Sequence, residues 1–226
     1  MAIIKTGFLS PFKNKLGNGV GRRWRNLNIV AEYNGSPRNP RTTAQQIQRT
    51  IFAVLSELAR SFKSTLNDAL GGVCAGTKTF PRAKFISLNK GAVTSSNPGS
   101  AVVAYSDIVI ARGSVTSVQF GAPDYDTPQT VECSFVDGAF KAAYPTADMS
   151  NVKVRLIAYC PDAKLAVFSD TVGTTDPATL VVPTYWNGMK VHIYGYTRWD
   201  GDDMPEYGLK KGDVSDSMYL GNGTIG

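Results

Sequence analysis

The chain has 226 residues, of which 42% are hydrophobic, and its formal net charge at pH 7 is +6. This length and composition suit a folded protein of one or two domains and exclude an intrinsically disordered chain. No stretch approaches the roughly 18 consecutive apolar residues of a membrane-spanning helix, and the first residues lack the apolar run of a secretory signal. We therefore expect a protein that stays in the cytoplasm in which it is made and has no membrane partner.

Charge is distributed unevenly along the chain. Residues 1 to 90 contain 15 Lys and Arg against three acidic residues, a balance of +12, whereas residues 91 to 226 contain nine against 15, a balance of −6. The basic part can attract nucleic acid, or it can attract the acidic part of a neighbouring copy. We favour the second interpretation, because the basic residues are scattered and do not alternate with aromatic residues as in a stacking platform.

The first 35 residues are short segments separated by glycine. Residues 22 to 25 and 28 to 33 carry β-branched and aromatic side chains on both sides of Asn26-Leu27, which predicts a small β-hairpin. A segment of this kind buries little apolar surface alone. We therefore expect it to act as an arm that lies on another surface.

A long helix is predicted to begin at Thr42. Thr42 stands three residues before Gln45, the spacing of a capping box, and apolar residues then recur at three- and four-residue steps until Gly71-Gly72. Pro81 fits the first turn of a second, short helix within residues 80 to 88. The apolar stripe of the long helix comprises Ile47, Ile51, Leu55, Leu58, Phe62, Leu66 and Leu70.

From residue 101 onward, short apolar runs are separated by Gly, Pro, Asn and Asp, which predicts a sandwich of seven to nine strands. Residues 152 to 159 and 190 to 196 are predicted to be the central strands of its two sheets, and the prolines around residues 177 to 183 predict an edge strand or a short strand. The predicted strands cover residues 101–105, 107–111, 114–120, 130–136, 152–159, 164–169, 179–182, 189–197 and 215–219.

The predicted fold class is therefore α+β and mainly β. Residues 1 to 90 are expected to form the basic β-hairpin arm and the helical segment. Residues 91 to 226 are expected to form an immunoglobulin-like antiparallel β-sandwich.

Residues that could carry chemistry are few. His192 is the single histidine and lies in an alternating strand, so it is interpreted as a residue on a sheet face. The three cysteines, Cys74, Cys133 and Cys160, are odd in number and widely spaced, which indicates neither a disulfide framework nor a zinc site. The glycines between residues 17 and 21 lack the lysine that ends a phosphate-binding loop. We expect no catalytic residue, no cofactor and no required metal.

The acidic run from Asp200 to Glu206 resembles a calcium loop only in composition, because it lacks the ligand spacing of an EF-hand. We interpret it as a solvated hairpin tip and leave calcium binding open. The arginines of the arm are predicted to pair with this run on a neighbouring copy. The predicted interface residues are Arg22, Arg23, Trp24, Arg25, Arg38, Arg41, Asp200, Asp202, Asp203 and Glu206.

Several segments resemble the signature of an uncharacterised family of Bacteroidota and their phages, in which a GKLGNVVG hairpin with a following tryptophan precedes NPRT-x-A-Q at the start of a long helix. The residues that carry the resemblance include Gly7-Phe8-Leu9, KNKLGNGVG at residues 13 to 21, NPRTTAQQ at residues 39 to 46 and SDSMYLG at residues 215 to 221. Val30-Ala31-Glu32 departs from the basic residues that the family carries there.

Members of that family resemble ring proteins of the neck and tail of crAss-like bacteriophages. The resemblance implies a non-catalytic virion structural protein that is assembled in the host bacterial cytoplasm and forms a homo-oligomeric ring. It also implies partners such as portal-proximal rings and the tail hub, with non-specific contact to genomic DNA. Two alternatives stay open: a capsid-decorating or fibre-attachment protein, and a cytoplasmic nucleic-acid-binding protein.

Overall fold

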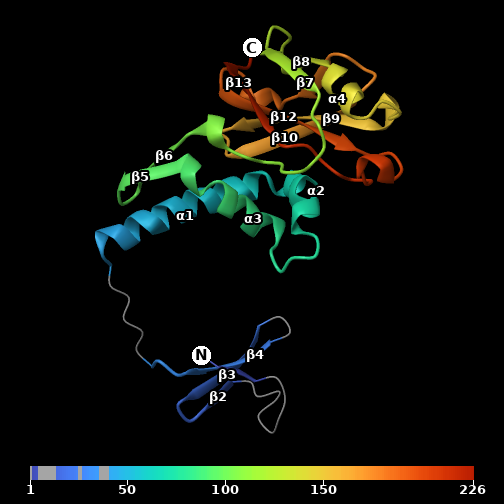
Figure 1. Cartoon of the computed structure of the whole chain (residues 1–226). Coiled ribbons are helices and arrows are strands. Elements are labelled where there is room, and N and C mark those ends of the chain that lie inside the picture. The colour runs from blue at the N-terminus through green and yellow to red at the C-terminus, as the bar shows by residue number, and fades with distance from the viewer. Residues whose placement is uncertain (1, 5–13, 25–26, 36–40) are drawn as a thin grey trace. The chain divides into compact units, whose positions relative to one another are not determined.

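The computed structural model describes residues 2–4, 14–24, 27–35 and 41–226 (Figure 1). The chain divides into two compact units, Met1–Thr42 and Thr43–Gly226. The boundary between the units thus lies before the first helix. The sequence pattern predicted it after residue 90. The physical reason is that the helices share a hydrophobic core with the strands of the C-terminal part.

The N-terminal unit contains a four-stranded antiparallel sheet in the order β1-β4-β3-β2. The predicted hairpin is confirmed, because β3 and β4 pair from Gly19 opposite Glu32 to Trp24 opposite Leu27. Ile29 has the one buried apolar side chain among those that the structure describes in this unit. The strands are β1 (Ala2–Ile4), β2 (Asn14–Leu16), β3 (Gly19–Trp24) and β4 (Leu27–Glu32).

The C-terminal unit begins with three helices, α1 (Thr43–Ser61), α2 (Lys63–Cys74) and α3 (Pro81–Leu88). The buried part of the predicted stripe is confirmed, and α3 begins at the predicted proline. The prediction of one continuous helix ending at Gly71-Gly72 is wrong. The helix breaks at Phe62, whose ring is fully buried. The two glycines lie inside α2, because burial of Leu70 and Cys74 on either side offsets their low helix propensity, about 1 kcal/mol each.

The centre of this unit is a four-stranded antiparallel sheet in the order β10-β9-β12-β13. Residues 152–159 and 190–196 were predicted to lie in different sheets, which is wrong: they belong to β9 and β12, which pair directly, with Tyr194 opposite Ile157. Both strands carry apolar side chains on both faces, as strands of a sheet covered on two sides do. The bounds are β9 (Val152–Cys160), β10 (Leu165–Val172), β12 (Lys190–Trp199) and β13 (Met218–Thr224).

Each face of this sheet packs against a different layer. Leu156 and Ala158 of β9 share a core with a second, three-stranded antiparallel sheet in the order β11-β8-β7, while Ile157 and Tyr159 share a core with the helices. Figure 1 shows the helices on one side of the central sheet and β7 and β8 on the other. The result is a mixed fold with more strand than helix and antiparallel sheets, as predicted. The second sheet comprises β7 (Gln119–Asp124), β8 (Thr130–Val136) and β11 (Ala178–Val181).

The segment between the helices and the second sheet contains less strand than predicted. Most of residues 104–118 lie outside strands, although Ile108 and Ile110 are buried there. The hydroxyl of Ser217 accepts hydrogen bonds from the backbone N–H groups of Ile110 and Ala111 and so replaces part of a strand ladder. The remaining elements are the hairpin β5 (Val93–Asn97) and β6 (Ser100–Val103), α4 (Gly138–Ala143), and the 3-10 turns η1 (Lys90–Ala92), η2 (Tyr105–Asp107), η3 (Met149–Asn151), η4 (Thr184–Trp186) and η5 (Pro205–Tyr207).

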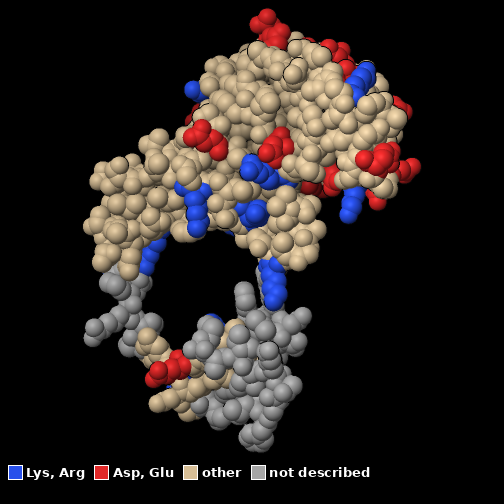
Figure 2. All heavy atoms as spheres, in the orientation of Figure 1, with Lys and Arg blue, Asp and Glu red and all other residues tan. Residues whose placement is uncertain are grey.

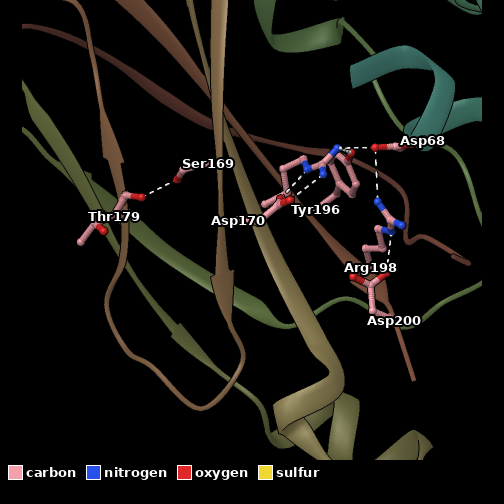
Figure 3. A network of polar contacts seen from close by, with 8 residues as sticks. Asp68, Ser169, Asp170, Thr179, Tyr196, Arg198 and Asp200 are labelled. Atoms are coloured by element: carbon pink, nitrogen blue, oxygen red, sulfur yellow. Dashed lines mark hydrogen bonds and ion pairs between the residues drawn. The ribbon is translucent and has the colours of Figure 1, made fainter. Parts of the chain in front are cut away.

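The edge strand predicted around residues 177–183 is confirmed as β11. β10 of the central sheet lies beside the outer edge of β11, and two of its side chains bind backbone groups of that edge. The Ser169 hydroxyl donates to the Thr179 carbonyl oxygen (Figure 3). The Thr179 N–H donates to the Thr171 hydroxyl at 3.4 Å. These side chains satisfy the backbone groups of Thr179 and so hinder pairing of this edge with another strand. No helix within the described residues is long and apolar enough to cross a membrane.

Candidate functional site

A buried arginine of the central sheet lies at the centre of the most extensive polar network in the described residues (Figure 3). The Arg155 side chain on β9 is 3% exposed, and its Nε and Nη2 atoms donate to the two carboxylate oxygens of Asp170 on β10 at 2.5 and 2.6 Å. This bidentate geometry is the strongest form of an arginine–carboxylate contact. The third nitrogen, Nη1, donates to Asp68 of α2 at 3.2 Å and to the Tyr196 hydroxyl at 3.0 Å.

The network continues to the surface through a second arginine. Arg198 Nη1 lies 3.2 Å from the same Asp68 oxygen, and Arg198 Nε lies 2.8 Å from Asp200 Oδ1. Asp68 therefore connects two arginines of the central sheet to the helical layer. It is one of only two acidic residues in the helical segment of residues 43–90.

The network is a set of fixed charges. Burial acts against the charge of Arg155, but its hydrogen bonds and charge interactions with Asp170, Tyr196 and Asp68 more than compensate, so its pKa lies above the ordinary value. Burial also raises the pKa of Tyr196. Both groups stay protonated at physiological pH, and Arg155 donates the hydrogen bond that the Tyr196 hydroxyl accepts. This arrangement positions the helices on the sheet.

His192 forms a second buried polar site, beside β13. Its side chain is 6% exposed, its Nδ1 lies 3.0 Å from the Tyr219 hydroxyl, and its ring stacks on Tyr105 at 4.0 Å between centroids. Burial, and then the charge of Lys190, lower the pKa of His192 to about 4. The prediction of a histidine on a sheet face is confirmed.

The lowered pKa of His192 predicts a pH-dependent stability. The unfolded chain, in which this pKa is about 6.5, binds more protons than the folded chain between pH 6.5 and 4, so the free energy of unfolding should fall as the pH falls through this window. We expect a loss of about 1–3 kcal/mol that His192→Gln abolishes. Urea unfolding at pH 7, 6 and 5 measures it. Parallel losses in the wild type and the variant would contradict the assignment.

A family model matches residues 11–221, which includes strands of both compact units. The family is described as a family of unknown function, DUF6266. The chain belongs to the DUF6266 family. Neither the curated proteins nor the solved structures contain a match to it.

The predicted interface residues of this DUF6266 protein fall in both units. In the N-terminal unit, the Arg22 and Arg41 side chains are exposed, Arg23 and Trp24 belong to β3, and Arg25 and Arg38 lie outside the described residues. Their predicted pairing with a neighbouring copy stays a prediction.

Two residues of the acidic run bind partners within their own chain. Asp200 pairs with Arg198, and Asp203 Oδ1 accepts a hydrogen bond from the Lys211 N–H at 2.9 Å. Asp202 and Glu206 are exposed. Among the residues that the structure describes, no group of three His, Cys, Asp or Glu side chains is arranged to hold a metal ion.

Sequence reasoning missed the network of this DUF6266 protein. A signal was present, because Arg155 lies between Val154 and Leu156 in a predicted central strand and Asp68 is one of two acidic residues in the basic segment of residues 43–90. A buried charge of this kind requires a partner. The partners lie far along the chain from one another, so the sequence did not identify them.

Proposed function

We propose that this DUF6266 protein is a non-catalytic structural subunit that assembles head to tail into a homo-oligomeric ring in the neck or tail of a crAss-like bacteriophage. The ring would be assembled in the host bacterial cytoplasm. Its neighbours would be portal-proximal rings and the tail hub, with non-specific contact to genomic DNA. The resemblance of the N- and C-terminal segments supports the virion role. The charge polarity of the C-terminal unit supports the mode of assembly and carries the proposal.

The helical layer and the sandwich carry opposite charge. Residues 43 to 90 contain seven Lys and Arg and two acidic residues, a balance of +5, while residues 91 to 226 carry −6. Both acidic side chains of the helices are already paired inside the chain, Asp68 with the two arginines of the network and Glu57 with Lys164 at 2.8 Å. In the view of Figure 2, the basic side chains gather over the helices, and most of the acidic ones lie over the sandwich.

This polarity supports a heterologous contact, in which one patch meets a different patch on the next subunit. Such contacts close into a ring when the rotation between subunits permits. Opposite potentials steer the two patches together and suppress like-to-like contacts. The N-terminal unit adds eight basic residues against one acidic residue and has little buried apolar surface among its described side chains, which supports its role as an arm.

The immunoglobulin-like sandwich is also part of the proposal. Numbered in chain order from β7 to β13, the first, second and fifth strands form one sheet and the other four form the second. An immunoglobulin constant domain differs from this only in its fourth strand, which joins the first sheet. Here the fourth strand is β10, and it pairs with β9. The order of the other strands supports the immunoglobulin-like assignment.

The proposal predicts assembly that depends on salt. At 50 mM NaCl we expect a discrete oligomer of the 24.3 kDa chain, and at 1 M NaCl, where the screening length falls to about 3 Å, mostly monomer. Light scattering after size exclusion measures the mass, and negative-stain microscopy distinguishes closed rings from open filaments. A monomer at every salt concentration would contradict the proposal.

Binding of a fluorescent DNA duplex in the same buffers tests the main alternative. A monomer that binds DNA with a steep salt dependence would favour the nucleic-acid-binding protein. A monomer that binds no DNA would favour the decorating or fibre-attachment role.

A further inference from the structure

A groove of about 420 Å³ opens in the helical layer, between the α1–α2 break and the start of α3. Its floor is apolar, because Ala59 and Leu66 line it and are 1% and 2% exposed. Its rim carries the ring of Phe80, which is 69% exposed, and three basic side chains, those of Arg60, Lys63 and Arg82. A large exposed aromatic beside three cations marks a surface suited to a partner.

The cations of this groove have no ion-pair partner in the part of the chain that the structure describes. Neither Arg60 nor Lys63 forms an ion pair with any described residue, and Arg82 reaches only the Ser56 carbonyl oxygen, at 3.5 Å. An occupant that complements the groove must therefore carry clustered negative charge and a small apolar group.

The hairpin of β7 and β8 has this chemistry. Residues 113 to 140 contain four acidic residues and no Lys or Arg. Asp124 lies directly opposite Glu132 in the strand register, and like charges in that position are destabilising. No described Lys or Arg pairs with either carboxylate. Asp126 and Pro128 at the tip are exposed and add a further charge and an apolar group.

We propose that the groove binds the β7–β8 hairpin of a second copy of this chain, with the acidic tip between Arg60, Lys63 and Arg82 and with Pro128 against Phe80. Figure 1 shows the hairpin tip and the helical layer at opposite ends of the C-terminal unit, so each copy presents the groove at one end and the hairpin at the other. The two subunits use different surfaces in this contact, so the contact is heterologous. The inference rests on the proposed head-to-tail assembly and specifies its two surfaces.

Two charge-reversal variants of the full chain test the contact. A groove variant carries Arg60→Glu and Lys63→Glu, and a tip variant carries Asp124→Lys and Asp126→Lys. Each alone should weaken assembly at least about 100-fold in sedimentation or light scattering at 50 mM NaCl, because like charges then face each other. The chain with all four changes should assemble again.

A mixture of the two variants is the sharpest measurement. The intact tip of the groove variant fits the intact groove of the tip variant, and the reversed tip of the tip variant fits the reversed groove of the groove variant. The mixture should therefore regain, with alternating subunits, the assembly that each variant alone has lost. Thermal melting of each variant confirms that the exposed changes leave the fold intact.

Matched controls change the same number of charges elsewhere. Lys210→Glu with Lys211→Glu, and Asp107→Lys with Asp162→Lys, alter exposed residues outside the groove, the hairpin tip and the predicted interface and should shift assembly by less than about threefold. If the tested variants assemble like the wild type, or the mixture stays as unassembled as each variant alone, or either control abolishes assembly, the groove contact is wrong while head-to-tail assembly stands. A wild type that stays monomeric contradicts both.

Discussion

Replacing Asp170 by alanine is expected to lower the free energy of unfolding by about 2–4 kcal/mol. The change removes both hydrogen bonds of the bidentate pair and leaves the guanidinium of Arg155, which is 3% exposed, with Asp68 and Tyr196 as its hydrogen-bond partners. A buried charge that has lost its principal partner is costly, because water does not replace the missing carboxylate easily. Urea unfolding followed by far-ultraviolet circular dichroism measures the loss.

Replacing Arg155, the other partner of the pair, should lower the free energy of unfolding by less. Arg155→Met fills the same space with apolar atoms and removes one hydrogen bond from the buried Tyr196 hydroxyl. It leaves behind Asp68 and Asp170, whose side chains are 43% and 34% exposed and remain hydrated. Replacing a buried charge by an apolar side chain of similar volume is often close to neutral. Asp162→Ala, at an exposed carboxylate, is the control and should change the stability by less than about 0.5 kcal/mol. Equal losses for Asp162→Ala and Asp170→Ala would show that the network contributes nothing.

Phe62→Ala is expected to lower the free energy of unfolding by about 3–5 kcal/mol. The Phe62 ring is fully buried at the break between α1 and α2, and its centroid lies 5.8 Å from Phe85, 5.2 Å from Tyr159 and 6.2 Å from Tyr194. These partners belong to α3 and to both central strands. The change therefore leaves a cavity where the helical layer meets the sheet.

Phe52→Ala provides the matched control, because Phe52 also lies on α1 but is 46% exposed. It should cost less than about 1 kcal/mol. The helical signal at 222 nm and tryptophan fluorescence from the sandwich should be lost in one transition for Phe62→Ala, since both layers share the core. A variant whose helices melt first while the sandwich stays folded would contradict a single cooperative unit.

The sequence by itself determined the local elements of this protein. The apolar stripe, the β3–β4 hairpin pairing, the proline that begins α3 and the proline-flanked edge strand β11 all depend on residues within a few positions of one another. Periodicity and turn chemistry act over that range. The uneven distribution of charge could also be derived from the sequence, because it is a sum over residues and requires no coordinates.

Only the tertiary structure decided how these elements combine. Alternation shows which side chains of a strand share a face, but it does not show which strand lies next to it, so β9 and β12 were predicted in two sheets when they pair in one. Packing of Phe62 broke the long helix, and the shared core moved the domain division to Thr42. Asp68, Arg155 and Arg198 meet across separations of 87 and 130 residues. Such contacts depend on chain topology, which short-range sequence patterns do not encode.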